Sequence, residues 1–340
     1  MSTDAYARAG VHRDVAREIR WRIAEAVRST WGAEVIAEWG AFAGLYRADL
    51  LWRMEKPVLV ATTDGVGTKL KVAARFNRWE TIGYDLVHHC VNDILVHGGR
   101  PLFFLDYIAA GRLDPDVIVR IVESVAAACR EVGCALLGGE TAELPGVYAP
   151  GELDLAGTLI GVVEHVRIRD GSRIRPGDHL LALPSSGLHT NGYSLARMVL
   201  AGLDWEKSLP ELGTSIGEAL LAPHRCYLEP IQRLESAGVD LKGLCHVTGG
   251  GVYENLPRVL LRGTAAVLRR GTWPEPPIFG LIQRIGRISD QEMFRVFNMG
   301  LGMLLVVPPQ DVELALATLP GELRVVGEIM AGEQEVRVEM

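Results

Sequence analysis

Glycine-rich turns that follow apolar stretches constrain the fold of this chain more than any other feature of its sequence. The 340 residues include 38 glycines, which cluster at 138–139, 185–192, 249–251 and 300–302. Apolar runs suited to strands and amphipathic runs suited to helices border these clusters, so we expect an α/β (α+β) enzyme. The sequence contains no short repeat and no low-complexity segment, which disfavours a solenoid.

The expected elements alternate along the chain. Asp114 and Pro115 have the chemistry of a helix start, a capping carboxylate followed by proline at the first helical position. The polar, turn-rich segment 165–178 is the expected domain junction. We predict strands at 58–62, 102–109, 135–137, 157–163, 179–183, 264–268, 301–307 and 323–328, and helices at 81–97, 115–132, 191–201, 217–221, 226–236 and 252–260.

Composition excludes several classes of protein. Apolar residues make up 48% and charged residues 23% of the chain, so it has enough apolar surface to form a folded core. The net charge of −7 lacks the basic footprint that a nucleic-acid partner requires. A small anionic ligand remains compatible with a locally basic site.

Cysteine spacing and the N-terminal sequence indicate a cytoplasmic protein without a membrane partner. None of the five cysteines forms a CxxC pair, so neither a zinc knuckle nor a disulfide framework is predicted. Charges run through the N-terminal residues and leave no apolar core for a signal peptide. No apolar run reaches the roughly 18 residues that a membrane span needs.

The segment 62–69 combines groups that suit a phosphate and its metal. It reads Thr-Thr-Asp-Gly-Val-Gly-Thr-Lys directly after an apolar strand. Gly65 and Gly67 would let backbone amides approach oxyanions closely. Lys69 supplies a cation and Asp64 a hard oxygen for Mg²⁺. The spacing differs from the Walker pattern, and a plain turn is the competing interpretation.

Carboxylates beyond this loop extend the magnesium prediction. The helix 81–97 carries a polar stripe that includes Asp93, and a solvated helix face is the competing interpretation. Glu140 follows a Gly-Gly pair after the strand-like 135–137. Asp64, Asp93 and Glu140 together would form a cluster of hard oxygens for Mg²⁺. Glu143 suits a surface or capping role equally well.

Histidines on the same helix suggest zinc only weakly. His89, Asp93 and His97 recur at four-residue intervals. A zinc site would normally add a further ligand or an activating glutamate, and no H-E-x-x-H pattern is present. We therefore do not predict a zinc site on this helix.

Two further glycine-containing loops carry polar groups. Residues 185–193, Ser-Ser-Gly-Leu-His-Thr-Asn-Gly-Tyr, offer hydroxyls, an imidazole and an amide before a helix, and suit either an anion site or a helix cap. Residues 246–255 contain Thr248, Gly249, Gly250 and Gly251, for which we favour a phosphate cradle over a flexible turn.

Taken in order, these motifs resemble the phosphoribosylformylglycinamidine cyclo-ligase family, the aminoimidazole ribonucleotide synthetases. The resemblance extends from about residue 57 to the C-terminus. It rests on TTDGVGTKL at 62–70, CVND at 90–93, PLFFLDYIA at 101–109, GGETAELPG at 138–146, SSGLHTNGYSLAR at 185–197, HVTGGGVYENLPRVL at 246–260 and EMFRVFNMGLGM at 292–303.

The resemblance implies an architecture and a reaction. The architecture is an N-terminal segment (1–56) that closes over ATP, an ATP- and Mg²⁺-binding domain (57–166) and a C-terminal α/β domain (167–340). The N-terminal domain would hold a mixed sheet and contribute to a β-barrel shared in a homodimer. The reaction is ATP-dependent C–N bond formation that converts formylglycinamidine ribonucleotide to aminoimidazole ribonucleotide, ADP and phosphate in purine biosynthesis.

The resemblance also implies roles for particular residues. Asp64, Asp93 and Glu140 would hold Mg²⁺. His189 and Asn191 would contact the reacting amide, with His189 as a candidate proton carrier. The ATP phosphates would be held by Gly65, Gly67, Thr68 and Lys69 with Asp93 nearby, and the ribose 5′-phosphate by Thr248, Gly249, Gly250 and Gly251.

Departures from the family pattern lie in the first 56 residues and in three histidines. A Gly-Gly-Phe-Gly-like stretch is replaced by Gly-Ala-Phe-Ala-Gly at 40–44, which bears on nucleotide affinity. His88, His89 and His97 fall where the family needs no histidine, so we expect no role for them. The alternatives are a catalytically silent nucleotide-binding paralogue and a related small-molecule kinase or selenophosphate synthetase.

Overall fold

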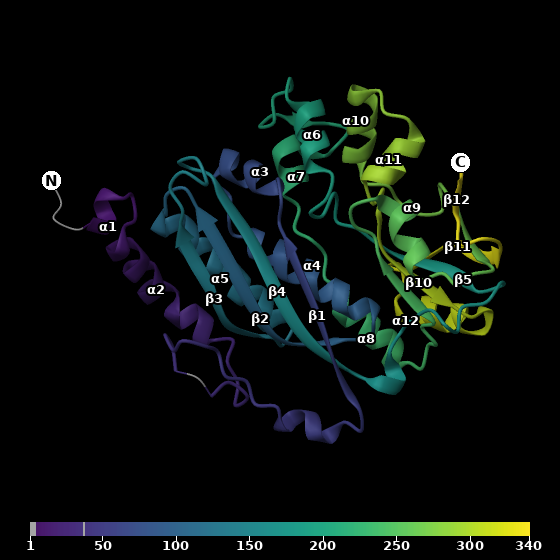
Figure 1. Cartoon of the computed structure of the whole chain (residues 1–340). Coiled ribbons are helices and arrows are strands. Elements are labelled where there is room, and N and C mark those ends of the chain that lie inside the picture. The colour runs from purple at the N-terminus through teal and green to yellow at the C-terminus, as the bar shows by residue number, and fades with distance from the viewer. Residues whose placement is uncertain (1–4, 37) are drawn as a thin grey trace. The chain divides into compact units, whose positions relative to one another are not determined.

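The computed structural model describes residues 5–36 and 38–340, which form two compact units. The first unit runs to Ile94 and resumes over Gly99–Val166; the second comprises Leu95–Gly98 with Arg167–Met340. Each unit contains its own main β-sheet (Figure 1). This architecture confirms the predicted α/β (α+β) class. Within the described residues, no helix is both long and apolar enough to cross a membrane.

The first unit is built on a mixed four-stranded sheet with the order β1-β4-β2-β3. Strand β4 is antiparallel to both of its neighbours, whereas β2 and β3 run parallel. The strands are β1 (Pro57–Gly65), β2 (Arg100–Ala110), β3 (Ala135–Glu143) and β4 (Leu153–Glu164). All four were predicted, but β3 is six residues longer than expected and includes the Gly-Gly-Glu motif, for which a turn was expected.

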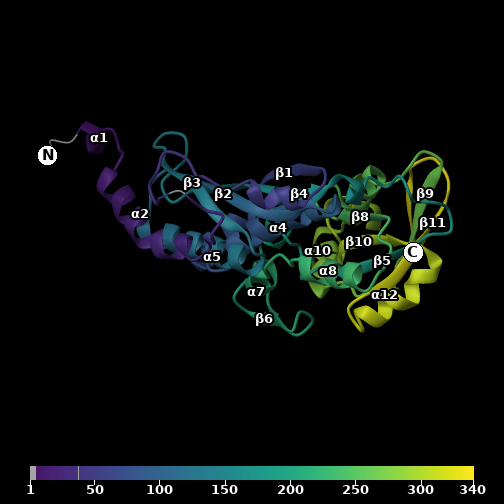
Figure 2. The same ribbon diagram turned by 90° about the horizontal axis from the view of Figure 1, so that it is seen from below.

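Helices cover one face of this sheet. Helices α4 (Ile82–Val96) and α5 (Pro115–Glu131) lie on the same side of it (Figure 2). Asp114 caps α5 by accepting hydrogen bonds from the amides of residues 116 and 117, which confirms the predicted helix start. Every second side chain of β1 points to the opposite face of the sheet. One of them, Leu59, is 63% exposed.

The segment before β1 forms structure that the sequence patterns did not predict. Helices α1 (Ala5–Arg8) and α2 (Arg13–Arg28) are followed by the 3₁₀ helix η1 (Asp49–Arg53). Helix α2 contacts α5 through a buried stripe of Ile19, Ile23 and Val27. Helix α3 (Lys69–Phe76) begins directly after the glycine turn of the first motif.

The second unit is built on a six-stranded sheet with the order β12-β9-β11-β5-β10-β8. Only β12 pairs in parallel, and every residue of β10 is buried. The strands are β5 (His179–Pro184), β8 (Gly243–His246), β9 (Thr264–Arg269), β10 (Leu301–Val307), β11 (Arg324–Ala331) and β12 (Val336–Glu339), with β6 (Ser208–Leu209) and β7 (Thr214–Ser215) as a separate pair.

The helices of the second unit include several that the sequence did not predict. Helices α10, α11 and α12 are additional, as are strands β8 and β12. The predicted helix 252–260 is instead the short α9 followed by the 3₁₀ turn η3. The bounds are η2 (His165–Arg167), α6 (Tyr193–Leu200), α7 (Ile216–Leu221), α8 (Leu228–Ser236), α9 (Gly251–Asn255), η3 (Leu256–Arg258), α10 (Pro277–Gly286), α11 (Asp290–Val296), η4 (Pro309–Asp311) and α12 (Val312–Thr318).

Candidate active site

Asp64 and Asp93 lie on either side of His89 in the first unit. Asp64 is at the end of β1, and its Oδ2 is 2.7 Å from His89 Nε2. Asp93, one turn further along α4, has its Oδ2 3.6 Å from the same nitrogen. The structure therefore brings together two of the three predicted metal ligands. It also gives His89 a contact that its sequence context did not predict.

The protonation of this group follows from its contacts. Burial opposes ionisation of Asp64, but the hydrogen bond and charge of His89 lower the pKa of Asp64 below its ordinary value. Burial likewise disfavours the charged imidazole, yet Asp64 and Asp93 raise the pKa of His89. Asp64 is therefore ionised at neutral pH, with oxygens of the kind that Mg²⁺ prefers.

Lys69 lies in the interior rather than at an open phosphate site. Its Nζ is 2.7 Å from Asp85 Oδ1, and both side chains are 0% exposed. Burial lowers the pKa of Lys69 while Asp85 opposes that shift. Because Lys69 is the first residue of α3, its ion pair with Asp85 ties the start of that helix to α4. This differs from the mobile cation that the motif suggested, and a direct phosphate contact of Lys69 stays a prediction.

Glu140 faces the opposite side of the sheet from Asp64. The register pairs Asp64 with Gly157, Gly157 with Asp106, and Asp106 with Gly139. Residues directly opposite each other in neighbouring strands point to the same face, so Glu140, one residue further on, points to the other face. Within the described chain, Glu140 is thus separated from the other two predicted metal ligands.

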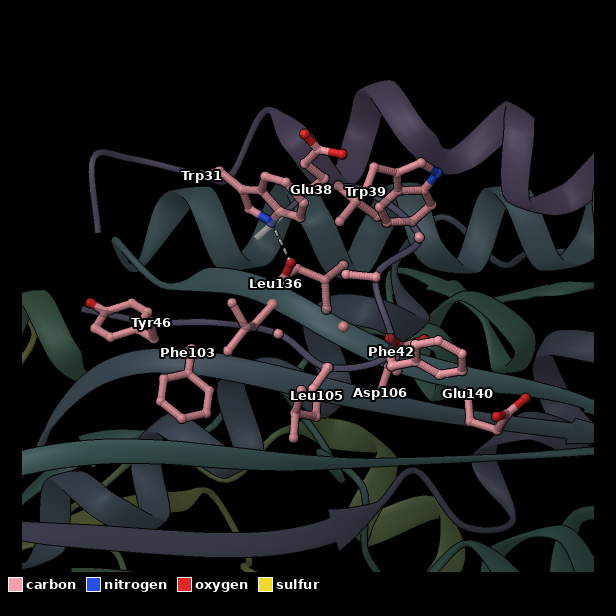
Figure 3. A pocket seen from close by; sticks show the side chains of 18 of the residues that line it. Trp31, Glu38, Trp39, Phe42, Tyr46, Phe103, Leu105, Asp106, Leu136 and Glu140 are labelled. Atoms are coloured by element: carbon pink, nitrogen blue, oxygen red, sulfur yellow. Dashed lines mark hydrogen bonds between the residues drawn. The ribbon is translucent and has the colours of Figure 1, made fainter. Parts of the chain in front are cut away.

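Glu140 lines a cavity of about 890 Å³ between the N-terminal segment and the sheet (Figure 3). Trp31, Trp39 and Phe42 contribute aromatic surface from the N-terminal segment, and Asp106 lies in the wall. Burial raises the pKa of Asp106 to about 7, and the negative charge of Glu140 adds to the shift. The cavity is therefore lined mainly by aromatic and aliphatic groups, and Arg20, Arg47 and Glu38 add further charged groups to its lining. The size suits a small organic ligand.

Specific contacts hold the N-terminal segment over this cavity. Trp31 Nε1 donates a hydrogen bond to the Leu136 carbonyl oxygen at 2.8 Å. Glu143, with a side chain only 3% exposed, accepts from the His12 amide at 2.6 Å and the Leu113 amide at 3.1 Å. Burial opposes ionisation of Glu143, but these hydrogen bonds lower its pKa. Glu143 is thus buried and anchors the N-terminal segment. This contact excludes the surface role that the sequence also allowed.

In the second unit, sheet topology brings the two remaining glycine loops together. Strands β5 and β8 are both antiparallel to β10, so they run parallel to each other and end at the same edge. Near the start of β10, Pro184 pairs with Leu301 and His246 pairs with Met303. The loops 185–192 and 247–250 leave the sheet from these positions. A methyl group added to Gly249 would lie 3.1 Å from Asn191 Oδ1, which shows how closely the loops approach.

Two asparagines that the motifs did not single out hold these loops. Asn255 donates from Nδ2 to the carbonyl oxygens of Gly249 at 3.0 Å and Gly251 at 2.8 Å. Asn298 donates to the Gly187 carbonyl oxygen at 2.9 Å and accepts from Ser185 Oγ at 2.8 Å. Both lie inside the quoted motifs, but only the folded loops reveal their partners.

Gly251 and His189 have left-handed backbone conformations. Gly251 has φ +58°, and an added Cβ would lie 1.9 Å from the Phe294 carbonyl oxygen, so only glycine fits there. His189 has φ +61°, which is uncommon for a residue with a side chain and occurs at functional sites. The structure thus places His189, Asn191 and the 248–251 loop at one edge of the sheet.

His88 and His97 have local partners. His88 Nε2 is 3.6 Å from Glu131, and the His88 ring packs edge-on against Tyr84. His97 Nδ1 lies 3.3 Å from the Arg169 carbonyl oxygen in the second unit. These contacts are structural in character and add nothing to the zinc hypothesis.

Comparison with known proteins identifies the family of this chain. The chain matches the family described as AIR synthase related protein, with its N-terminal domain at residues 44–163 and its C-terminal domain at residues 175–339. It is 46% identical to a phosphoribosylformylglycinamidine cyclo-ligase of Gloeobacter violaceus, covering 98% of this chain and 96% of the relative. A protein of the same name from Symbiobacterium thermophilum is 48% identical, with 96% and 95% covered.

Solved structures share the fold at lower identity. Thiamine-monophosphate kinase from Stenotrophomonas maltophilia superposes with a TM-score of 0.66 at 18% identity, covering 93% of this chain and 95% of that one. HypE from Escherichia coli superposes with a TM-score of 0.67 at 18% identity, covering 95% and 93%. The matched domains span most of the sequence, and the chain belongs to the family of AIR synthase related proteins.

Proposed function

We propose that this chain is an ATP-dependent cyclo-ligase that converts formylglycinamidine ribonucleotide to aminoimidazole ribonucleotide, ADP and phosphate. Curated cyclo-ligases that are 44–48% identical over nearly the full chain support this activity. The observation that carries the assignment within the structure is the meeting of two loops at the ends of β5 and β8. One loop supplies His189 and Asn191 for the reacting amide, and the other supplies residues 248–251 for the ribose 5′-phosphate, at one edge of the sheet.

The reaction explains why both loops are needed. An amide oxygen is a poor leaving group, so its phosphorylation by ATP makes an imino-phosphate. The amidine nitrogen of the same substrate then attacks that carbon, loses a proton and closes the five-membered ring as phosphate leaves. Holding the two ends of one molecule in this geometry lowers the barrier by removing translational and rotational freedom beforehand.

In this scheme each loop has a separate task. The amides of Gly249, Gly250 and Gly251, with the Thr248 hydroxyl, hold the ribose 5′-phosphate. Asn191 binds the reacting amide, and His189 holds or carries the proton that ring closure releases. Asn255 is a positioning residue because its amide nitrogen fixes the carbonyl groups of the glycine loop.

The first unit supplies the groups that suit a magnesium nucleotide. Asp64 and Asp93 offer oxygens near each other, and we propose these two carboxylates as ligands of Mg²⁺, without Glu140, which points to the other face of the sheet. When bound, the ion would neutralise charge on the ATP phosphates. The turn amides of Gly65 and Gly67 and the Thr68 hydroxyl would bind phosphate oxygens.

The aromatic cavity beneath the N-terminal segment suits the adenine of ATP. Trp31, Trp39 and Phe42 offer ring faces, and stacking of a base on an aromatic side chain contributes about 1–3 kcal/mol. Replacing Phe42 by alanine should therefore weaken ATP binding about tenfold or more. Calorimetric titration with a non-hydrolysable ATP analogue measures this effect. Unchanged affinity for the ATP analogue would show that the adenine base does not bind in this cavity.

A second copy of the chain is the proposed partner of the exposed part of the sheet face that also forms the floor of the aromatic cavity, which Leu59 lines as well. Leu59 is 63% exposed and Tyr107 is 40% exposed on this face, and Thr63 and Thr158 bond to each other there. Burying the face in a homodimer would remove this apolar surface from water. Leu59→Glu should give a monomer by light scattering. Trp21→Glu, at an 80% exposed residue of α2, is the matched control and should stay dimeric.

One assay tests the proposed activity. The purified chain is mixed with ATP, Mg²⁺ and formylglycinamidine ribonucleotide, and both ADP and aminoimidazole ribonucleotide are measured. Equal amounts of the two products are expected. ATP binding without turnover would support the silent paralogue, and ADP release with thiamine monophosphate instead would support a small-molecule kinase.

A further inference from the structure

Three histidine rings form a buried cluster behind the loop that carries His189. His189, His224 and His246 are 1%, 1% and 5% exposed. One nitrogen from each ring lies within 4.8 Å of the other two. His224 follows α7 and belongs to none of the sequence motifs, so the fold alone brings it to the site.

His224 contacts both of the functional loops. Its ring stacks on His189, with centroids 4.0 Å apart and an interplanar angle of 21°. Its Nε2 lies 3.0 Å from His246 Nε2, and its Nδ1 lies 3.4 Å from Thr190 Oγ1. His246 is the last residue of β8, two positions before Thr248. One side chain thus links the amide-binding loop to the phosphate loop.

The contacts fix the position of the proton on the neutral His189 ring and couple the proton positions of His224 and His246. A backbone amide can only donate, so the Ser186 N–H, 3.2 Å from His189 Nε2, leaves the neutral His189 ring with its proton on Nδ1. Only one proton can lie between the two Nε2 atoms of His224 and His246. Whichever ring carries it, the other must carry its own proton on Nδ1. The tautomers of His224 and His246 are therefore coupled.

A transition metal is the alternative that such a cluster raises, and the ring geometry disfavours it. Imidazole lone pairs lie in the ring plane, and a tetrahedral ion needs them to converge on one point. Stacking keeps the lone pairs of His189 and His224 in nearly parallel planes. The bond from Ser186 also occupies His189 Nε2.

We propose that His224 is a positioning residue of the cyclo-ligase reaction. Its stacking fixes the plane of the His189 ring, and its hydrogen bond couples the tautomer of His246 to its own and holds the His246 ring beside the phosphate loop. The amide end and the phosphate end of the substrate are thereby held at a constant separation. This inference rests on the proposed function for its kinetic part, whereas the proton positions follow from the structure alone.

Two substitutions separate stacking from hydrogen bonding. His224→Phe keeps a flat ring against His189 but removes both nitrogens. His224→Gln keeps a donor and an acceptor but removes the ring. Because a misplacement of about 1 Å can cost roughly 100-fold in rate, His224→Gln should lower kcat about 100-fold, and His224→Phe about tenfold. KM for ATP should not change, since the proposed ATP site lies in the first unit. His88→Phe, at a buried histidine of α4, is the control for loss of an imidazole.

Nitrogen NMR of the ¹⁵N-histidine-labelled chain gives a readout that a merely structural role would not move. In the wild type, His189 should show the neutral form protonated on Nδ1, identified by comparison with His189→Gln. In His224→Gln this signal should shift or broaden while the melting temperature stays within a few degrees.

The outcomes distinguish the inference from the proposed function. Folded variants with kcat within twofold of the wild type, or a wild-type His189 protonated on Nε2, would overturn the positioning role. Zinc that copurifies with the wild type and is absent from His224→Phe would overturn it in favour of a metal site. An inactive wild type with the expected NMR signals would remove the proposed function and leave the histidine arrangement intact.

Discussion

The two units organise their polar centres in opposite ways. The first unit uses charge: Asp64 and Asp93 flank His89, and Lys69 pairs with Asp85 in the interior. The second unit uses neutral amides, imidazoles and glycine backbone, as in the bonds of Asn255 to the 249–251 loop. Ionised groups suit a metal and a triphosphate, whereas neutral groups suit positioning without a large desolvation cost. Substitutions can test this division by the size and pH dependence of their effects.

The largest effect is expected for the buried ion pair. Replacing Lys69 by methionine leaves the Asp85 carboxylate buried without its cation, and should lower the free energy of unfolding by about 3–5 kcal/mol. Urea denaturation followed by circular dichroism measures the change. Asp85→Asn should be similarly destabilising. A loss below about 1 kcal/mol would mean that the pair is hydrated in solution and that the first unit depends less on charge than we infer.

A smaller effect is expected in the neutral network. Asn255→Ala removes the donor to the carbonyl oxygens of Gly249 and Gly251, and should cost about 1–3 kcal/mol. It should also raise KM for the ribonucleotide, because the phosphate cradle loses its support, while KM for ATP stays constant. Steady-state kinetics with each substrate varied separately make the measurement. Equal rises in both KM values would show that the effect is not confined to the phosphate cradle.

Acid should loosen the N-terminal segment, which the Glu143 carboxylate anchors. The hydrogen bonds of Glu143 lower its pKa in the folded state, so its contribution is present above the unfolded value of about 4.3 and is lost as pH falls through the folded value. Below about pH 4, protease cleavage before residue 48 should therefore accelerate. The Glu143→Gln variant should already be cleaved faster than the wild type at pH 6. The increase should correspond to a loss of about 1–2 kcal/mol in the free energy that holds the segment in place. Cleavage that is independent of pH in both proteins would contradict this anchor.

The smallest effect is expected at Lys71, two residues beyond the buried lysine. Lys71 pairs with Glu152, and their side chains are 42% and 47% exposed. Lys71→Met should therefore change stability by less than about 1 kcal/mol. The same denaturation experiment serves as the matched control for Lys69. A loss as large as that at Lys69 would mean that burial is not what distinguishes the two pairs.

Sequence patterns predicted the elements that carry the motifs better than the contacts between them. Alternation and glycine boundaries predicted β1, β5 and β10, and capping chemistry predicted the start of α5. The long extension of β3 was missed because glycine and glutamate have low strand propensity, and pairing with β2 overrides it. Helix α2 was missed because charged residues fill much of 13–28, and its buried stripe is narrow.

Site residues divide in the same way. Asp64 and Asp93 were predicted as a pair because each belongs to a local motif, and the fold brings them together. Glu140 was wrongly grouped with them. Alternate residues of a strand point to opposite faces of the sheet, and Glu140 points to the face opposite Asp64. His224 and Asn298 contact the loops of the site through partners far away in sequence, and no local pattern identifies such contacts.

The pairing of β5 and β8 with the single strand β10 has a consequence for substrate size. Neighbouring strands lie about 4.8 Å apart, so the roots of the two loops are separated by roughly 9.6 Å, whatever the loops themselves contain. Strand β10 is buried throughout and contributes hydrogen bonds to both sides. The hydrogen bonds of the sheet thus set the distance between the two loops that we propose to bind the two ends of the ribonucleotide. If the two loops bind the two ends of the substrate as proposed, backbone geometry sets the spacing of the loop roots, and His224 fixes the ring orientations within that spacing.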